Sequence, residues 1–165
     1  MTDPDDLEDE WTPDDPDTEA SVFYEIEEGE TSVTGGRTLT EADVANFAGV
    51  SGDFNHLHLD KERMADSMFG ERIVHGTLVL SAATGLLWQS RSPEERASVV
   101  AFYGMDKLRF RAPVYYDDTI HLETTVTEKT EKPDGPGSGT VRYDVEIKNQ
   151  TGATVISCEM LSLLR

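Results

Sequence analysis

The sequence predicts an α+β fold in which an antiparallel sheet curls around one buried helix. Residues 77–88 are apolar or small on every side of a helical projection, and a helix without a polar face is buried in a protein core. Four later stretches alternate apolar and polar residues, which is the period of strands with one packed and one solvated face. One buried helix followed by four long antiparallel strands packs most economically when the sheet covers the helix.

The charge of the chain limits its partners. Its 165 residues, enough for one domain with a substantial core, carry 33 acidic and 14 basic side chains. Ten of the acids lie in residues 1–20, which we predict to be a disordered acidic tail ahead of a single domain at residues 21–165. The rest of the chain is also acidic, which argues against nucleic acid and membrane surfaces as partners. Acidity with few lysines is typical of halophilic proteins, although an ordinary acidic protein with an acidic tail has the same composition.

The cysteine content and the N-terminus indicate a compartment. Cys158 is the single cysteine of the sequence, which excludes an internal disulfide framework and fits a reducing environment. The N-terminus is acidic and contains no apolar stretch like that of a signal peptide. We therefore expect a cytoplasmic protein.

Local signals divide the N-terminal half into short elements. Residues 22–26 favour a short strand. Thr40 is an expected N-cap, with Asp43 in the first turn of a helix that ends near Gly49. The expected elements that follow are a polar loop, a short helix and the central helix, over residues 51–60, 61–68 and 76–90.

The C-terminal half is predicted to consist of strands. They are expected from the alternating pattern, with a turn rich in glycine and proline at residues 133–139. The end of the first strand places three bases on one face: Lys107, Arg109 and Arg111. The four strands cover residues 99–111, 120–127, 141–148 and 155–164.

A candidate site lies just before the central helix. Asp53 and His58 are five residues apart in the polar loop, and a carboxylate and an imidazole that converge can hold and deprotonate a water molecule. Gly76 is expected to begin the helix, where its free N–H could stabilise an oxyanion. Together these groups suit the addition of water to an activated carbonyl compound or its removal. Capping or surface roles for a loop aspartate and histidine are the alternative.

The same residues resemble a known family. Residues 53–58 (DFNHLH), then Phe69 and residues 73–76 (IVHG), resemble the signature of the MaoC-like (R)-specific enoyl-CoA hydratases. The resemblance covers roughly residues 38–122 and extends more loosely to the C-terminus. It implies a hot-dog fold, a long helix wrapped by an antiparallel sheet, paired as a homodimer. It also implies an acyl-CoA substrate and no cofactor beyond the coenzyme A of that substrate.

By resemblance, Asp53 and His58 activate the water that adds to C3 of a trans-2-enoyl thioester, giving an (R)-3-hydroxyacyl-CoA. The Gly76 N–H polarises the thioester carbonyl. The implied settings are fatty-acid metabolism or polyhydroxyalkanoate supply. This chain has His56 where the family often has proline, and we expect its side chain to point to solvent.

Other residues have two interpretations each. Asn55 fixes the loop near the substrate or merely forms an Asx-turn. His75 shapes the helix start or touches substrate. Thr84 falls where some members carry a helix serine near the catalytic carboxylate, or is a small packing residue bonded to the preceding turn.

The three bases also have two interpretations. Lys107, Arg109 and Arg111 contact the phosphates of coenzyme A, or they only balance surface acids. His121 lies on the polar face of its strand, where we expect it to be exposed.

Three alternative functions remain open. A metal site could use carboxylates and imidazoles of one short loop, but no clear distant ligand other than His75 supports it, so no metal is predicted. Water activated by Asp53 could instead hydrolyse the thioester. The chain could also be an acyl-thioester binder without activity, or the silent half of a heterodimer, because fold does not prove function. The possible metal ligands of the loop are Asp53, His56, His58 and Asp60.

Overall fold

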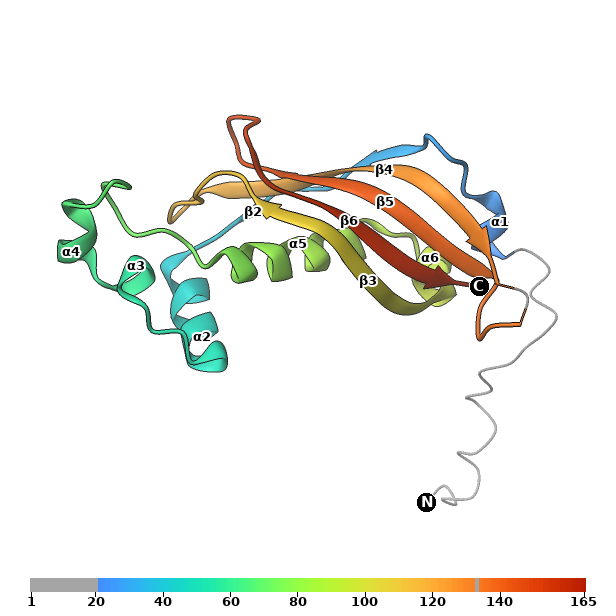
Figure 1. The fold of residues 1–165 in the computed structure, drawn as a ribbon, viewed down its shortest axis with the longest axis horizontal. Coiled ribbons are helices and arrows are strands. Elements are labelled where there is room, and N and C mark those ends of the chain that lie inside the picture. The colour runs from blue at the N-terminus through green and yellow to red at the C-terminus, as the bar shows by residue number, and fades with distance from the viewer. Residues whose placement is uncertain (1–20, 133) are drawn as a thin grey trace, which may run out of the picture.

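The computed structural model describes residues 21–132 and 134–165 of the chain. A six-stranded antiparallel sheet arches over the central helix α5, and the short helices α2 to α4 extend beyond one end of the sheet (Figure 1). This arrangement confirms the predicted α+β hot-dog fold. The helices are α1 (Val22–Glu25), α2 (Glu41–Ser51), α3 (His56–Leu59), α4 (Lys61–Ala65), α5 (Gly76–Ser90) and α6 (Pro93–Ser98). The strands are β1 (Thr31–Val33), β2 (Arg37–Thr38), β3 (Val99–Phe110), β4 (Thr119–Glu131), β5 (Gly139–Lys148) and β6 (Thr154–Leu164).

The sheet has the strand order β1-β4-β5-β6-β3, and β2 adds to β4. Its concave face supplies the core, because the apolar residue at every second position points toward α5. The central strands are the most deeply buried, whereas β3 forms an outer edge of the sheet. The core residues contributed by β4, β5 and β6 include Ile120, Leu122, Val145, Ile147, Ile156 and Met160.

Helix α5 has the predicted bounds but not the predicted burial. The side of α5 that faces the sheet is buried, including Leu78, Ala82 and Leu86. On its other side Thr77 and Ser81 are exposed, and Trp88 is 47% exposed. The expectation that α5 is buried on every side is therefore wrong within a single chain.

Helix α2 begins as predicted. The Thr40 side chain accepts a hydrogen bond from the Asp43 N–H, and the Asp43 carboxylate accepts one from the Thr40 N–H, which completes a capping box. The helix runs two residues past Gly49, to Ser51, and ends at Gly52 with a φ of 75°. A second capping box begins α6, which the sequence interpretation missed although Ser92 and Glu95 have the same spacing.

The expected strand at residues 22–26 is wrong, because this segment forms the helical turn α1. A single turn places Phe23 in a small core with Val126, Val141 and Leu164, at the end of the sheet farthest from α2. The Phe23 N–H also donates to the carbonyl of Arg165. Tertiary burial of one aromatic ring therefore decides the conformation of this segment.

The expectation of three bases on one face of β3 is confirmed, although a bulge interrupts the strand there. The pairing of β3 with β6 has a register shift between Asp106 and Arg109, and Lys107 adopts a φ of 52°. Such a bulge inserts an unpaired residue, so the side-chain alternation is broken there. The Lys107 ammonium still pairs with Glu159 on the convex face of the sheet. Arg109 is paired in register with Ser157 and Arg111 donates to the Ser157 hydroxyl, so all three bases lie on this face.

The predicted tail, residues 1–20, lies outside the described residues. Among the helices of residues 21–132 and 134–165, none is long and apolar enough to cross a membrane.

Candidate active site

A cavity of about 480 Å³ opens where α5 begins. Its floor is the N-terminal turn of α5, and its walls come from the loop after α2, the segment before α5 and the end of β3. The polar groups at one side of this apolar cavity are Asp53, His58 and His75. The apolar lining comprises Phe69, Ile73, Val74, Val79, Phe110, Pro113, Val114 and Ile156.

Local hydrogen bonds shape the loop that carries Asp53. Gly52 ends α2 in the left-handed region, which turns the chain toward the cavity. The Asp53 Oδ1 accepts from the Asn55 N–H at 3.2 Å, and the Asn55 side chain caps α3 by accepting from the Leu57 N–H at 3.1 Å. Asn55 therefore fixes the loop and is absent from the cavity lining.

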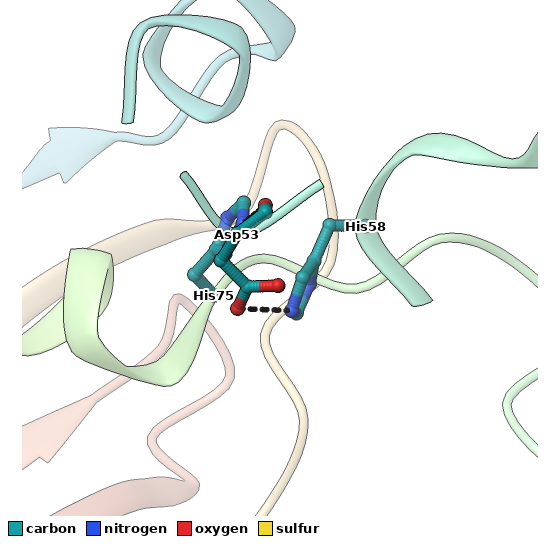
Figure 2. A group of neighbouring side chains, drawn as sticks. All are labelled: Asp53, His58 and His75. Carbon is teal, nitrogen blue, oxygen red and sulfur yellow. Dashed lines mark hydrogen bonds and ion pairs between the residues drawn. The ribbon is translucent and has the colours of Figure 1, made fainter. Parts of the chain in front are cut away.

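His58 is buried and faces Asp53 across the cavity wall. Its Nδ1 lies 2.8 Å from the carbonyl oxygen of Ile73, and because a carbonyl only accepts, Nδ1 carries the proton. The Nε2 is 3.9 Å from the Asp53 Oδ2 (Figure 2), too far for a direct hydrogen bond but suited to a bridging water. Burial lowers the pKa of His58, opposed by the hydrogen bond to Ile73. This keeps Nε2 unprotonated at neutral pH.

His75 lies behind this pair and is 1% exposed. Its Nε2 is 2.9 Å from the backbone carbonyl oxygen of Asp53, and its ring stacks on that of His58 with centroids 3.7 Å apart (Figure 2). It is the N-cap of α5, but its side chain makes no capping hydrogen bond. The ring therefore contacts both members of the Asp53–His58 pair.

Gly76 is the first residue of α5, as predicted. A first-turn N–H has no intrahelical acceptor and lies at the positive end of the helix dipole. Phe110 covers the position where a Cβ would lie: a carbon placed there is 2.6 Å from the Phe110 Cε1. Only glycine leaves room at this point for both the aromatic ring and a ligand oxygen.

The remaining predicted residues divide between the cavity and the outside. Arg111 lines the cavity, and its Nε donates to the Ser157 hydroxyl at 2.9 Å. Lys107 and Arg109 are exposed and do not line it. Thr84 lies in a different cavity of about 370 Å³, and its hydroxyl donates to the Ser81 carbonyl. Its predicted place near the carboxylate is wrong, because Thr84 is two turns of α5 beyond Gly76.

Two residues that support the site, Tyr116 and Arg72, were not predicted from the sequence. Tyr116 donates from its hydroxyl to the backbone carbonyl of His58, while Arg72 lies over the Tyr116 ring at 4.4 Å. Phe110 lies in the first of the four predicted long strands, but only the tertiary structure places it on Gly76. His56, expected in solvent, is half-buried and does not line the cavity, and His121 is paired with Glu123 on the sheet.

The three polar groups also form a cluster of possible metal ligands, since one atom each of Asp53, His58 and His75 lies within 4.8 Å of the others. The imidazole planes are only 26° apart, however. Ring nitrogens bind metals in the plane of the ring, and nearly parallel stacked rings direct their lone pairs side by side rather than toward one ion. The arrangement fits a bridging water better than a tetrahedral metal.

Comparison with known proteins identifies related chains. A family model described as MaoC like domain matches residues 25–149. Protein MaoC of Klebsiella aerogenes is 47% identical over 110 residues, which are 67% of this chain and 32% of that protein, so the chain spans about a third of that relative. The (R)-specific enoyl-CoA hydratase of Rhodospirillum rubrum is 34% identical over 105 residues, 64% of this chain and 69% of that enzyme.

A solved structure agrees with the fold. The monoamine oxidase regulatory protein from Archaeoglobus superimposes with a TM-score of 0.78 at 38% identity. The alignment covers 87% of this chain and 93% of the other. At this similarity the two chains share the same fold.

Proposed function

The chain belongs to the MaoC-like domain family, and on this premise we propose that it catalyses the reversible hydration of trans-2-enoyl-CoA to (R)-3-hydroxyacyl-CoA. The observation that carries the proposal is the Asp53–His58 pair, whose facing atoms lie 3.9 Å apart at the polar side of an apolar cavity. The name of the Rhodospirillum rubrum relative supports the choice of reaction and of the (R) product. We call Asp53 and His58 the catalytic pair.

The catalytic pair presents two proton acceptors to one water. The Asp53 carboxylate and the unprotonated His58 Nε2 each accept one hydrogen bond from it, leaving a lone pair of the water oxygen to attack C3. As the C3–O bond forms, one water proton passes to the pair, and the electrons of the C2–C3 double bond move toward the thioester carbonyl. The pair then delivers this proton to C2, which completes the addition of one water, and the reverse sequence removes water.

The N-terminus of α5 stabilises the charge that develops. The Gly76 N–H donates to the thioester oxygen, which gains negative charge in the enolate-like transition state. Both backbone geometry and helix dipole are fixed before substrate binds, so no reorganisation is needed. Phe69, Ile73 and Val114 supply apolar walls for the acyl chain.

Arg111 is the base proposed to meet a coenzyme A phosphate. It lines the cavity and is held by Ser157, whereas the exposed Lys107 is occupied by Glu159. A guanidinium presents several donors to phosphate oxygens in a fixed geometry. No cofactor is proposed beyond the coenzyme A of the substrate, and no step is assigned to a metal.

We also propose that two copies pair through β3 and the exposed face of α5. Within the described residues β3 ends the sheet, and an exposed edge strand of twelve residues is a template for another strand. Phe102 is 52% exposed on this strand, close to Trp88 in the cavity at the far end of α5. A measured molar mass equal to two chains, reduced to one by Phe102→Asp, supports this; a monomeric native protein contradicts it.

The test of the reaction is the loss of enoyl absorbance from crotonyl-CoA, followed for native protein and Asp53→Asn at low and high salt. We expect native turnover and a loss of at least about a hundredfold in the variant, the scale of one general base. Asp66→Asn removes the same charge from an exposed residue at the end of α4 and should leave the rate unchanged.

Two further outcomes separate the alternatives. Release of free thiol from an acyl-CoA, rather than loss of the double bond, would assign thioester hydrolysis to the same pair. Absence of both reactions on short and long enoyl chains, with acyl-CoA still bound, would make the chain a binding subunit.

A further inference from the structure

His75 is buried more completely than its place at a helix terminus requires. It is 1% exposed, and its ring contacts Asp53, His58 and Phe47. The ring does not cap α5. Because this buried imidazole neither caps its helix nor reaches solvent, its role lies in its contacts with neighbouring side chains and backbone. Two of the three residues that it contacts, Asp53 and His58, form the catalytic pair.

We infer that His75 is a positioning residue that holds the backbone of Asp53 through its Nε2–H and one face of His58 through ring stacking. The inference rests on the proposed function in one respect only: it takes the Asp53–His58 pair as the catalytic pair.

The first constraint acts on Asp53. Its other hydrogen bonds are local, with the Ser51 hydroxyl and the Asn55 N–H, so they shape the loop without tying it to the rest of the domain. The bond from the His75 Nε2 to the Asp53 carbonyl spans 22 residues and joins the loop to the start of α5. Because that carbonyl only accepts, Nε2 carries the proton of the His75 ring.

The second constraint acts on His58. Stacking at 3.7 Å covers one face of its ring and excludes water there. Burial is the largest cause of the lowered pKa of His58, and the charged or titratable groups that act on it are Asp53, His56 and His75. Stacking and the Ile73 carbonyl thus keep one orientation and one tautomer of His58, with Nε2 toward Asp53.

The orphaned nitrogen of His75 supports this assignment. Its Nδ1 is buried without a hydrogen-bond partner among the described residues. A buried polar atom without a partner is destabilising, and a phenyl ring would fill the same space and stack equally well without it. The advantage of imidazole over phenyl at this position is therefore the Nε2–H donor to Asp53.

Two variants separate the two constraints. His75→Phe keeps an aromatic ring against His58 but has no donor for the Asp53 carbonyl. His75→Gln keeps an N–H donor at a similar reach but has no ring to stack. The matched controls are His121→Phe and His121→Gln, on the polar face of β4.

The two variants are expected to change different kinetic properties. His75→Phe lowers kcat by about tenfold or more, the scale of one lost hydrogen bond, with little change in KM and an unchanged acid limb of the pH profile. His75→Gln retains most of kcat but moves the acid limb toward the ordinary value of 6.5, because water reaches His58. If both variants instead lose kcat equally, and in proportion to the fraction of protein that is no longer folded, His75 has only a structural role and the inference is overturned.

A spectroscopic measurement on the native protein is independent of activity. The chain has four histidines, so their imidazole ¹⁵N signals can be assigned with single His→Gln variants. We expect the His75 signals of an Nε2–H tautomer, a scalar coupling from that proton to the Asp53 carbonyl, and a His58 titration below 6.5 that rises in His75→Gln. An Nδ1–H tautomer of His75 would overturn the inference even if hydration is observed; correct tautomers without hydration would overturn only the proposed function.

Discussion

Adding one methyl group at Gly76 tests the close packing at the start of α5. A Cβ there would lie 2.6 Å from the Phe110 Cε1 and 2.7 Å from its Cδ1, far inside van der Waals contact. The backbone at Gly76 is helical and accepts alanine, so the strain comes from the ring alone. Phe110 is 55% exposed and can swing outward, so we place the loss of stability from Gly76→Ala at about 1–2 kcal/mol, the lower part of the range for overpacking.

A double-mutant cycle isolates this contact. Phe110→Ala removes all three ring atoms near Gly76 and, because the ring is half-exposed, should lower stability by about 1–2 kcal/mol on its own. In that background Gly76→Ala should be neutral or slightly stabilising, which gives a coupling free energy of about 1–2 kcal/mol between the two sites.

Urea unfolding of the four proteins measures the cycle, and the enoyl assay measures kcat/KM in parallel. We expect Gly76→Ala to lose activity in both backgrounds, because the methyl group crowds the N–H that receives the thioester oxygen. Additive stability changes would refute the steric argument. Full activity of Gly76→Ala would remove the helix N-terminus from the mechanism.

Three further predictions address electrostatics and capping. Because the folded pKa of His58 lies below the unfolded value of 6.5, the unfolded chain binds more protons just below that pH. The His58 contribution to stability should therefore be complete above 6.5 and decline as pH falls toward the folded pKa, seen as a pH-dependent unfolding midpoint that His58→Gln flattens. Arg111→Gln should raise KM for the acyl-CoA by about tenfold with little change in kcat, whereas the exposed Arg109→Gln should change neither. Thr40→Ala should lower the free energy of unfolding by about 1 kcal/mol, because the capping box of α2 is lost; an unchanged urea midpoint would contradict this.

Short-range signals were reliable in this chain. The bounds of α5, the four long strands and the Thr40 cap each depend on residues within a few positions of one another, and each was confirmed. The loop motif and the glycine that begins α5 indicated the family, whose fold is shown. The closeness of Asp53 and His58 was also predictable, since they are five residues apart in the sequence, although His58 lies in the helical turn α3 and not in a loop.

Two features of the structure that the sequence did not predict share a physical cause. A bulge shifts the register of β3 between Asp106 and Arg109, and bulges depend on pairing with another strand. Residues 22–25 became a helical turn because a ring-sized gap at the end of the sheet accepts Phe23. Neither event leaves a periodic trace in the local sequence.

By itself, the sequence determined the kinds of elements, their order and the chemical groups available, because hydrophobic period and capping act over one or two turns of chain. Only the tertiary structure decided which of those groups meet. His75 reaches the backbone of Asp53 across 22 residues, and Phe110 reaches Gly76 from the end of β3. These contacts form only when the sheet packs over α5, because this packing, and not any local preference of the chain, brings the distant segments of the site together.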